Sequence, residues 1–257
     1  MWGSVMDKRT RYYHTFTDDF FQAGETHPLP ENYEWVRQDR KSRFLSALIY
    51  GLALVFSTVY CRLWLHMRIK GARRLRQAGG GFFLFANHTQ PIGDVFHPAL
   101  ACFPKRIYTV VSPANLALPG IGKILPYLGA LPIPDSLHGM RAFNKAVEKR
   151  VGDGHPVIIY PEAHLWEYYT GIRPFPDTAF KFPVSLAQPT YCMTTTYQKR
   201  RFGKKPRITI FVDGPFAAAG KTAKEKAAAL HDAVYTCMKE RAQNSTYAYI
   251  SYTPYSS

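Results

Sequence analysis

The sequence has few acidic residues for its length. Aspartate and glutamate number 18 against 33 lysines and arginines, which leaves a formal net charge of +15 over 257 residues. An excess of this size indicates an anionic partner, either a nucleic acid or the acidic surface of a membrane. An apolar content of 46%, with 15% aromatic residues, is typical of a folded chain and argues against intrinsic disorder.

Cysteine is also scarce, and the C-x-x-C pattern does not occur. The cysteines are scattered over the chain, at Cys61, Cys102, Cys192 and Cys237. This spacing predicts neither a disulfide scaffold nor a zinc site and favours a reducing compartment. The G-x-S-x-G pattern is missing as well, which argues against the commonest class of α/β hydrolases. Residues 1–43 are too polar for a cleavable signal peptide.

One long uncharged stretch, residues 44–61, precedes a basic cluster. The stretch is just long enough to cross a membrane. Basic residues with no acid among them follow it, at Arg62, Arg68, Lys70, Arg73, Arg74 and Arg76. Such a cluster is attracted to anionic headgroups on the cytoplasmic side of a membrane. We therefore expect residues 44–76 to hold the protein on the cytoplasmic face of a membrane, either spanning it or lying on it. The alternative is a buried core helix that ends in a solvated basic turn.

From Gly81 onwards, short apolar segments alternate with amphipathic ones. The pattern predicts strands at 82–85, 106–111, 156–160, 190–197 and 207–212, and helices at 94–102, 136–151 and 223–242, with a broken helix at 114–125. This alternation is typical of an α/β fold with a mostly parallel sheet flanked by helices. We expect an N-terminal arm over 1–43, an apolar helix with its basic segment over 44–76, and one α/β domain over 77–257.

A polar group follows directly after the first of these strands. His88 lies three residues beyond Phe85, and Asp94 lies behind the turn-forming residues 90–93. A carboxylate that accepts a hydrogen bond from one ring nitrogen leaves the other free to take a proton, so the pair is a candidate general base with its orienting group. At the C-terminal edge of an open α/β sheet it would lie where ligands usually bind. The alternative is that His88 caps a turn and Asp94 caps a helix.

Several short blocks between Gly71 and Asp213 share the order and spacing of one enzyme family. They are Ala86–Asp94, Tyr127–Ile133 with Arg141 beyond it, Ile158–Glu162 followed by Arg173–Phe180, and Leu186–Thr190. Together they resemble the lysophospholipid acyltransferase family, the 1-acylglycerol-3-phosphate and glycerol-3-phosphate O-acyltransferases. Two details differ from that family: five residues instead of four separate His88 from Asp94, and residues 163–166 replace its G-T-R-S segment.

The resemblance implies an O-acyltransferase that moves a fatty acyl group from acyl-CoA or acyl-carrier protein to the hydroxyl of a lysophospholipid or glycerol-phosphate acceptor. It makes His88 the general base and Asp94 its orienting group. The residues implied in substrate binding are Asn87, Gly129, Glu162, Arg141 and Arg173, the two arginines as phosphate ligands. It implies no metal and no cofactor beyond the thioester co-substrate. The expected partners are an anionic membrane surface, the lipid acceptor and the acyl donor, and no nucleic acid is expected.

Two other functions fit parts of the sequence. A metal-dependent hydrolase could use His88, Asp94, His97, Glu162 and His164, whose side chains suit zinc or iron, although their spacing matches no standard metal motif. A non-enzymatic binder of lipid surfaces or nucleic acid could use the basic loop 199–205, with Tyr197 and Phe202 beside it.

Overall fold

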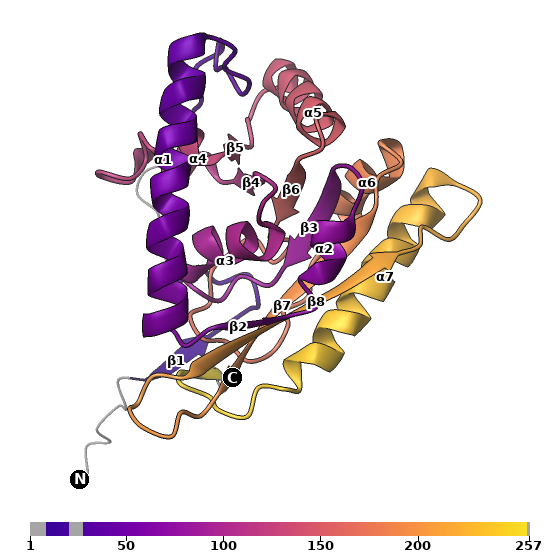
Figure 1. Ribbon diagram of the computed structural model, residues 1–257. Coiled ribbons are helices and arrows are strands. Elements are labelled where there is room, and N and C mark those ends of the chain that lie inside the picture. The colour runs from indigo at the N-terminus through magenta and orange to yellow at the C-terminus, as the bar shows by residue number, and fades with distance from the viewer. Residues whose placement is uncertain (1–8, 21–27, 256–257) are drawn as a thin grey trace.

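A seven-stranded sheet forms the centre of the protein in this computed structural model, which describes residues 9–20 and 28–255 (Figure 1). The strand order is β2-β8-β7-β3-β6-β4-β5. The strands are β2 (Arg68–Lys70), β3 (Phe82–Ala86), β4 (Tyr108–Val111), β5 (Ala130–Pro132), β6 (Pro156–Ile159), β7 (Thr190–Gln198) and β8 (Arg207–Phe216). Every neighbouring pair is parallel except β7 and β8, so β2 and β8 run against the other strands. The expectation of a mostly parallel α/β sheet is confirmed.

Helices cover both faces of this sheet. One face carries α2 (Arg73–Gln77) and α3 (Gly93–Cys102), and the other carries α5 (Leu137–Gly152), α6 (Lys181–Ser185) and α7 (Ala223–Ala242). The short α4 (Leu125–Leu128) packs against α1. A separate two-stranded parallel sheet joins β1 (Thr10–Tyr13) to β9 (Ser251–Pro254) and so brings these distant segments of the chain together.

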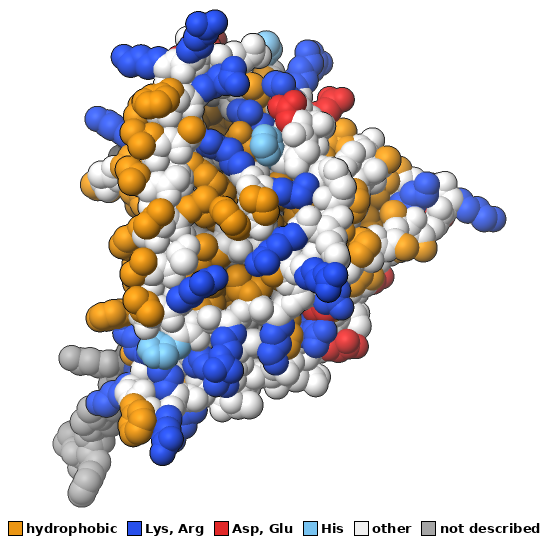
Figure 2. Space-filling model, viewed as in Figure 1, with side chains coloured by type: hydrophobic (Ala, Val, Ile, Leu, Met, Phe, Trp, Pro, Cys, Tyr) orange, Lys and Arg blue, Asp and Glu red, His pale blue; other side chains and the backbone are white. Residues whose placement is uncertain are grey.

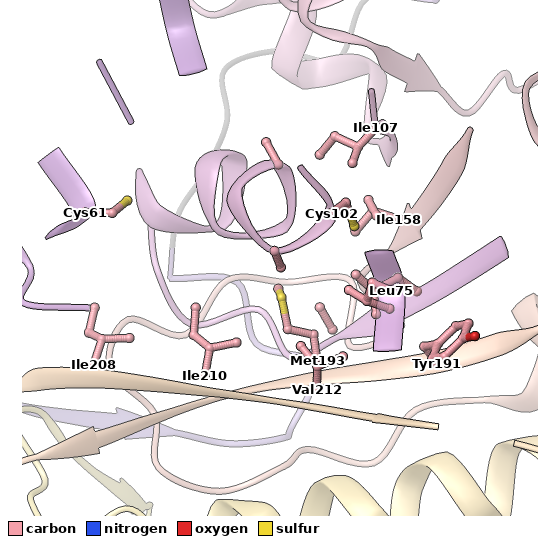
Figure 3. Close-up of a cluster of buried hydrophobic side chains, with 14 of the residues drawn as sticks. Cys61, Leu75, Cys102, Ile107, Ile158, Tyr191, Met193, Ile208, Ile210 and Val212 are labelled. Carbon is pink, nitrogen blue, oxygen red and sulfur yellow. The ribbon is translucent and has the colours of Figure 1, made fainter. Parts of the chain in front are cut away.

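The central strand β3 is buried on both faces. Phe82, Leu84 and Ala86 belong to the apolar cluster beneath α3, part of which is shown in Figure 3. Phe83 and Phe85 belong to the opposite cluster, with side chains of α5 and α7. Because side chains alternate along a strand, an unbroken apolar run is what a strand between two helical layers needs. Burial of all five residues fixes where the chain leaves the sheet, and therefore where His88 lies.

The uncharged stretch forms α1 (Arg40–Val59), continued by a π-helical turn over Tyr60–Trp64. The Asp39 carboxylate caps it by accepting from the Ser42 amide at 2.8 Å. Ser57 is its only buried residue. Its outer apolar side chains are open to solvent, as at Phe44 (72% exposed) and Val55 (66%), and they form the long edge of hydrophobic side chains in Figure 2. By length and composition this helix could cross a membrane. The apolar helix is confirmed, and the buried core helix is wrong because this surface is exposed.

Some elements differ from the expected ones. The sequence did not predict β1, β2, β5 and β9. β2 and β5 have three residues each and β1 and β9 four, which is too short to show a clear alternating pattern. The broken helix expected over 114–125 is a 3₁₀ turn, Pro113–Ala117, with α4 starting only at Leu125.

The expected boundaries of the chain's parts also shift. Because β2 pairs with β8 and Leu75 is fully buried, the boundary expected between residues 76 and 77 separates no structural units. The arm expected over 1–43 contributes β1 and also Trp35, whose indole donates to the Pro132 carbonyl at 2.9 Å. Residues 1–8 and 21–27 of that arm lie outside the described residues.

Candidate active site

His88 and Asp94 meet directly beyond the end of β3. His88 Nδ1 lies 2.8 Å from Asp94 Oδ2. The same oxygen accepts from the backbone amides of Thr89 and Gln90, each at 2.8 Å. A carboxylate held by two amides can only accept from the imidazole, so it places the ring proton on Nδ1. Nε2 makes no hydrogen bond with any described residue, and the His88 side chain is 26% exposed. The arrangement provides an accessible proton acceptor with a fixed tautomer.

The five-residue spacing between His88 and Asp94 is accommodated by Gly93, which begins α3. A Cβ atom at this position would lie 2.5 Å from Cε1 of His97, a contact that no side chain could make without displacing the ring. His97 is fully buried, and its Nδ1 lies 3.9 Å from Asp94 Oδ1. Neither ring nitrogen of His97 hydrogen-bonds to a described residue. Position 93 therefore has no room for a side chain next to the His97 ring.

Tyr160 supports the pair from the neighbouring strand, and the sequence patterns give it no role. It follows β6 directly, and its ring centroid lies 4.6 Å from that of His88. Its hydroxyl donates to the backbone carbonyl of Asp94 at 2.5 Å. Burial raises the pKa of this hydroxyl well above its ordinary value, and the Asp94 charge adds to the effect. Tyr160 therefore stays a neutral donor that holds both the imidazole and the start of α3.

Glu162 also lies against His88, but behind it and away from solvent. Its Oε2 accepts from the His88 amide at 3.1 Å, and its Oε1 accepts from the Arg173 amide at 2.9 Å. Burial raises the pKa of this carboxyl, and the charge of Arg173 opposes that shift. Glu162 joins two loops beside the site, and its side chain is fully buried. Direct contact of Glu162 with a substrate does not fit this position.

Arg173 is the partner of Glu162 and not an open phosphate ligand. Its Nη2 donates to Glu162 Oε2 at 3.3 Å and to the His164 carbonyl, and its Nη1 donates to the Phe16 carbonyl at 3.1 Å. The guanidinium lies over the ring of Trp166, 4.9 Å from its centroid. With a side chain 1% exposed, it cannot reach a substrate phosphate in this conformation. The expectation that Arg173 grips phosphate is therefore corrected to a structural ion pair.

The other implied binding residues lie elsewhere or are already engaged. The Asn87 carboxamide is saturated by Thr195 of β7: its Nδ2 donates to that residue's carbonyl at 3.1 Å, and its Oδ1 accepts from its amide at 2.8 Å. Gly129 ends α4 with φ of 97°, where a Cβ would lie 2.5 Å from the Ile107 carbonyl oxygen. Asn87 therefore ties its loop to β7 and Gly129 allows the chain to turn after α4, and neither arrangement presents the residue to a substrate.

Arg141 lies on the exposed face of α5. It makes no ion pair or hydrogen bond with any residue that the structure describes. α5 follows β5, which is three strands from β3 and so lies roughly 14 Å along the sheet from the His88 strand. A role for Arg141 in holding phosphate stays a prediction.

The side chains proposed for a metal-dependent hydrolase do not converge. Within the described ranges, the group that brings three ligand atoms within 4.8 Å of one another is Cys192, Asp213 and Cys237, far along the chain from His88. Both oxygens of Asp213 already accept from Arg241, at 2.7 and 2.8 Å. The cluster of His88, Asp94, His97, Glu162 and His164 is thus not assembled as a metal site in the part of the chain that is described.

The basic loop 199–205 offers little to a nucleic acid. Tyr197 is fully buried, and its hydroxyl lies 2.6 Å from Thr89 Oγ1, so it cannot stack on a base. Arg200 donates to the carbonyls of Pro206 and Trp64 at 3.0 and 2.9 Å. Phe202 alone of these aromatic residues is open to solvent. The combination of aromatic and basic residues expected here is therefore not presented on one surface.

The buried His97 makes stability depend on pH. Burial lowers its pKa to about 4, and the Asp94 charge only partly opposes this. Since the unfolded pKa is about 6.5, His97 binds a proton more readily in the unfolded chain. Above pH 6.5 His97 is neutral in both states and does not lower the free energy of unfolding. As the pH falls from 6.5 towards 4, its protonation in the unfolded chain lowers that free energy by up to about 3 kcal/mol.

Urea unfolding at pH 7 and at pH 4.5 measures this loss. The His97→Gln variant, which cannot titrate, is expected to lose less stability over the same interval. If both proteins lost the same stability between these pH values, the pH dependence could not be assigned to His97.

Comparison with known proteins adds a likeness of fold. No protein-family model and no curated protein matches the sequence. A solved structure that does resemble the chain is the 1-acyl-sn-glycerophosphate (LPA) acyltransferase PlsC from Thermotoga maritima, with a TM-score of 0.53 at 15% sequence identity. The match covers 80% of this chain and 84% of that one. The chain therefore shares the α/β architecture of that acyltransferase.

Proposed function

We propose that the protein is an O-acyltransferase that moves a fatty acyl group from a thioester, acyl-CoA or acyl-carrier protein, to the hydroxyl of a lysophospholipid or glycerol-phosphate acceptor. The observation that carries the proposal is the His88–Asp94 pair, with Nε2 open where the parallel strand β3 ends in a mostly parallel sheet. The fold shared with an acyltransferase supports it.

The pair suits a direct transfer with no acyl-enzyme intermediate. His88 Nε2 takes the proton of the acceptor hydroxyl as its oxygen attacks the thioester carbonyl, and Asp94 stabilises the imidazolium that forms. The tetrahedral intermediate collapses with cleavage of the C–S bond. The leaving thiolate takes the proton from Nε2, which restores the neutral imidazole. The substrate hydroxyl replaces the serine of a hydrolytic triad, in agreement with the missing G-x-S-x-G pattern.

An apolar surface adjoins this pair. Ile92 and Val95, on either side of Gly93 and Asp94, are 53% and 39% exposed. The helix that carries Asp94 packs on α1, with the rings of Phe96 and Phe56 5.7 Å apart. The exposed apolar face of α1 therefore continues to the rim of the catalytic pair, as a substrate with a fatty acyl chain requires.

Assay of the purified chain tests the reaction. Acyl-CoA or acylated acyl-carrier protein is incubated with 1-acylglycerol-3-phosphate, with glycerol-3-phosphate or with no acceptor, and both free thiol and acylated product are measured. Thiol release that depends on an acceptor, with one ester formed per thiol, is the expected result. Equal release without an acceptor would instead indicate a thioester hydrolase. No release with any acceptor or either donor would overturn the proposal.

Membrane association through α1 is part of this proposal. The exposed apolar side chains of the helix and the basic residues after it favour binding at an anionic surface. We expect the chain to sediment with membranes in high salt and to be released by detergent. Replacing Leu52 and Val55 by glutamine should make it soluble. Release by salt alone would rule out a span, and a soluble wild-type chain would rule out the anchor.

A further inference from the structure

A polar cavity lies away from the catalytic pair. Its volume is about 500 Å³, and it lies between residues 33–38, the first turns of α1, α4 and the end of α5. Its cationic side chains are Arg37, Arg43, Arg106, Lys149 and Arg150, against the acids Glu34 and Asp153. Figure 2 shows basic side chains between the upper part of α1 and α5. This volume is within the usual range for small-ligand sites.

The cavity opens at the edge of the sheet opposite His88. It is lined by Tyr108 and Ala130, which begin β4 and β5, and by His155, which immediately precedes β6. His88 and Glu162 instead follow the ends of β3 and β6. A four-residue strand is about 13 Å long, so a group bound here cannot also be the acceptor hydroxyl at His88.

Two arginines give the cavity a rigid cationic wall. Arg106 lies over the rings of Tyr50 and Tyr108, and its Nη2 donates to Ser46 Oγ and the Tyr127 carbonyl at 2.6 and 2.7 Å. Arg150 also lies over the ring of Tyr108, 4.3 Å from its centroid, and donates to the Trp35 carbonyl at 3.2 Å. In each guanidinium, one nitrogen is held by hydrogen bonds and the plane of the group is held by contact with an aromatic ring.

Neither arginine forms an ion pair with an acid in the part of the chain that the structure describes. Their Nε atoms are buried without a hydrogen bond among the described residues, and neither Nη1 donates to another of them. In the described part of the cavity wall, the ion pair formed is Lys149 with Asp153, at 3.1 Å. Burial lowers the pKa of Arg150, and the charge of Arg106 contributes in the same direction. Concentrating unpaired cations in a half-buried cavity costs free energy that a bound anion would offset.

We propose that this cavity binds the phosphate of an anionic ligand, at a site separate from the catalytic pair. Guanidinium groups bind phosphate through paired, charge-assisted hydrogen bonds, and Arg106 and Arg150 have such donors free. The headgroup of an anionic phospholipid fits best: Ser42 and Ser46 of α1 line the cavity, and the same turns expose Phe44 and Leu48 on the opposite side of the helix. A headgroup in the cavity would thus be held by the helix that we propose to bind the membrane.

Binding to the full-length chain tests this site without an activity assay. The probes are phosphatidylcholine vesicles with and without phosphatidic acid, and ATP and inorganic phosphate in solution. The double variant Arg37→Gln/Arg150→Gln removes two cavity cations. Lys145→Gln/Lys221→Gln, from exposed positions outside the cavity, removes the same charge and serves as the matched control. We expect the cavity variant to bind the phosphatidic acid vesicles at least about tenfold more weakly than the control.

A further variant covers the event that the first does not fold. Ser42 occupies the third position of α1, where glutamate favours helix formation, so Ser42→Glu adds an anion to the cavity while sparing the helix. It should weaken phosphate binding as well. Loss of ATP or phosphate binding, with vesicle binding equal to the control, would assign the same site to a soluble ligand. Equal weakening in cavity and control variants, or no binding of any probe, would overturn the site.

Discussion

Replacement of His88 by alanine is expected to lower the rate of acyl transfer by about a thousandfold, the usual contribution of a positioned general base. Nε2 of His88 is the accessible ring nitrogen at the site, whereas His97 is buried behind Asp94. The alcohol would then have to lose its proton to water. The measurement is acylated product formed at saturating acyl-CoA, so that the loss is one of turnover.

The fold should survive this substitution. The backbone of residue 88 keeps its hydrogen bonds to Glu162 and to the Trp166 amide, and the imidazole contributes little buried volume. His138→Ala, at an exposed position on α5, is the matched control and should transfer at the wild-type rate. Circular dichroism and thermal unfolding report whether each variant is folded. A folded His88→Ala protein with near-wild-type transfer would overturn the assignment of the base.

Replacement of Arg173 by methionine is expected to destabilise the protein by about 3–5 kcal/mol, the cost of leaving one partner of a buried ion pair alone. The Glu162 carboxylate would remain in a site where burial already raises its pKa, now without the opposing charge of Arg173. The backbone carbonyls of Phe16 and His164 would also lose a donor. Urea unfolding at pH 7 measures the change.

The double variant Arg173→Met/Glu162→Gln distinguishes the cost of the unpaired Glu162 charge from the cost of the lost Arg173 packing. It should recover part of the lost stability, because the remaining side chain is neutral. The control is Arg141→Met on the exposed face of α5, expected to change stability by no more than about 0.5 kcal/mol. If Arg173 instead bound the acceptor phosphate, its replacement would raise the KM for the acceptor and leave stability nearly unchanged. That result would contradict the ion pair as its main role.

The catalytic pair could be predicted from the sequence because it depends on a short segment of chain. The apolar run at 82–85 is typical of a buried strand, and a turn that contains Gly93 brings Asp94 back to His88 within six residues. The alternation of strands and helices likewise determined the mostly parallel sheet, and composition alone determined that 44–61 would be an apolar helix.

The tertiary structure decided which polar residues are available to a ligand. Asn87 and Arg173 have the chemistry of binding residues, yet their partners are the backbone of Thr195, 108 residues away, and of Phe16, 157 residues away. Arg106 and Arg150, unremarkable in the sequence, meet over Tyr108 only when α5 and β4 pack together. Local patterns determine where the chain turns and which faces are apolar. Whether a guanidinium is neutralised or left open depends on contacts between distant segments, and these arise only when the helical layers close over the sheet.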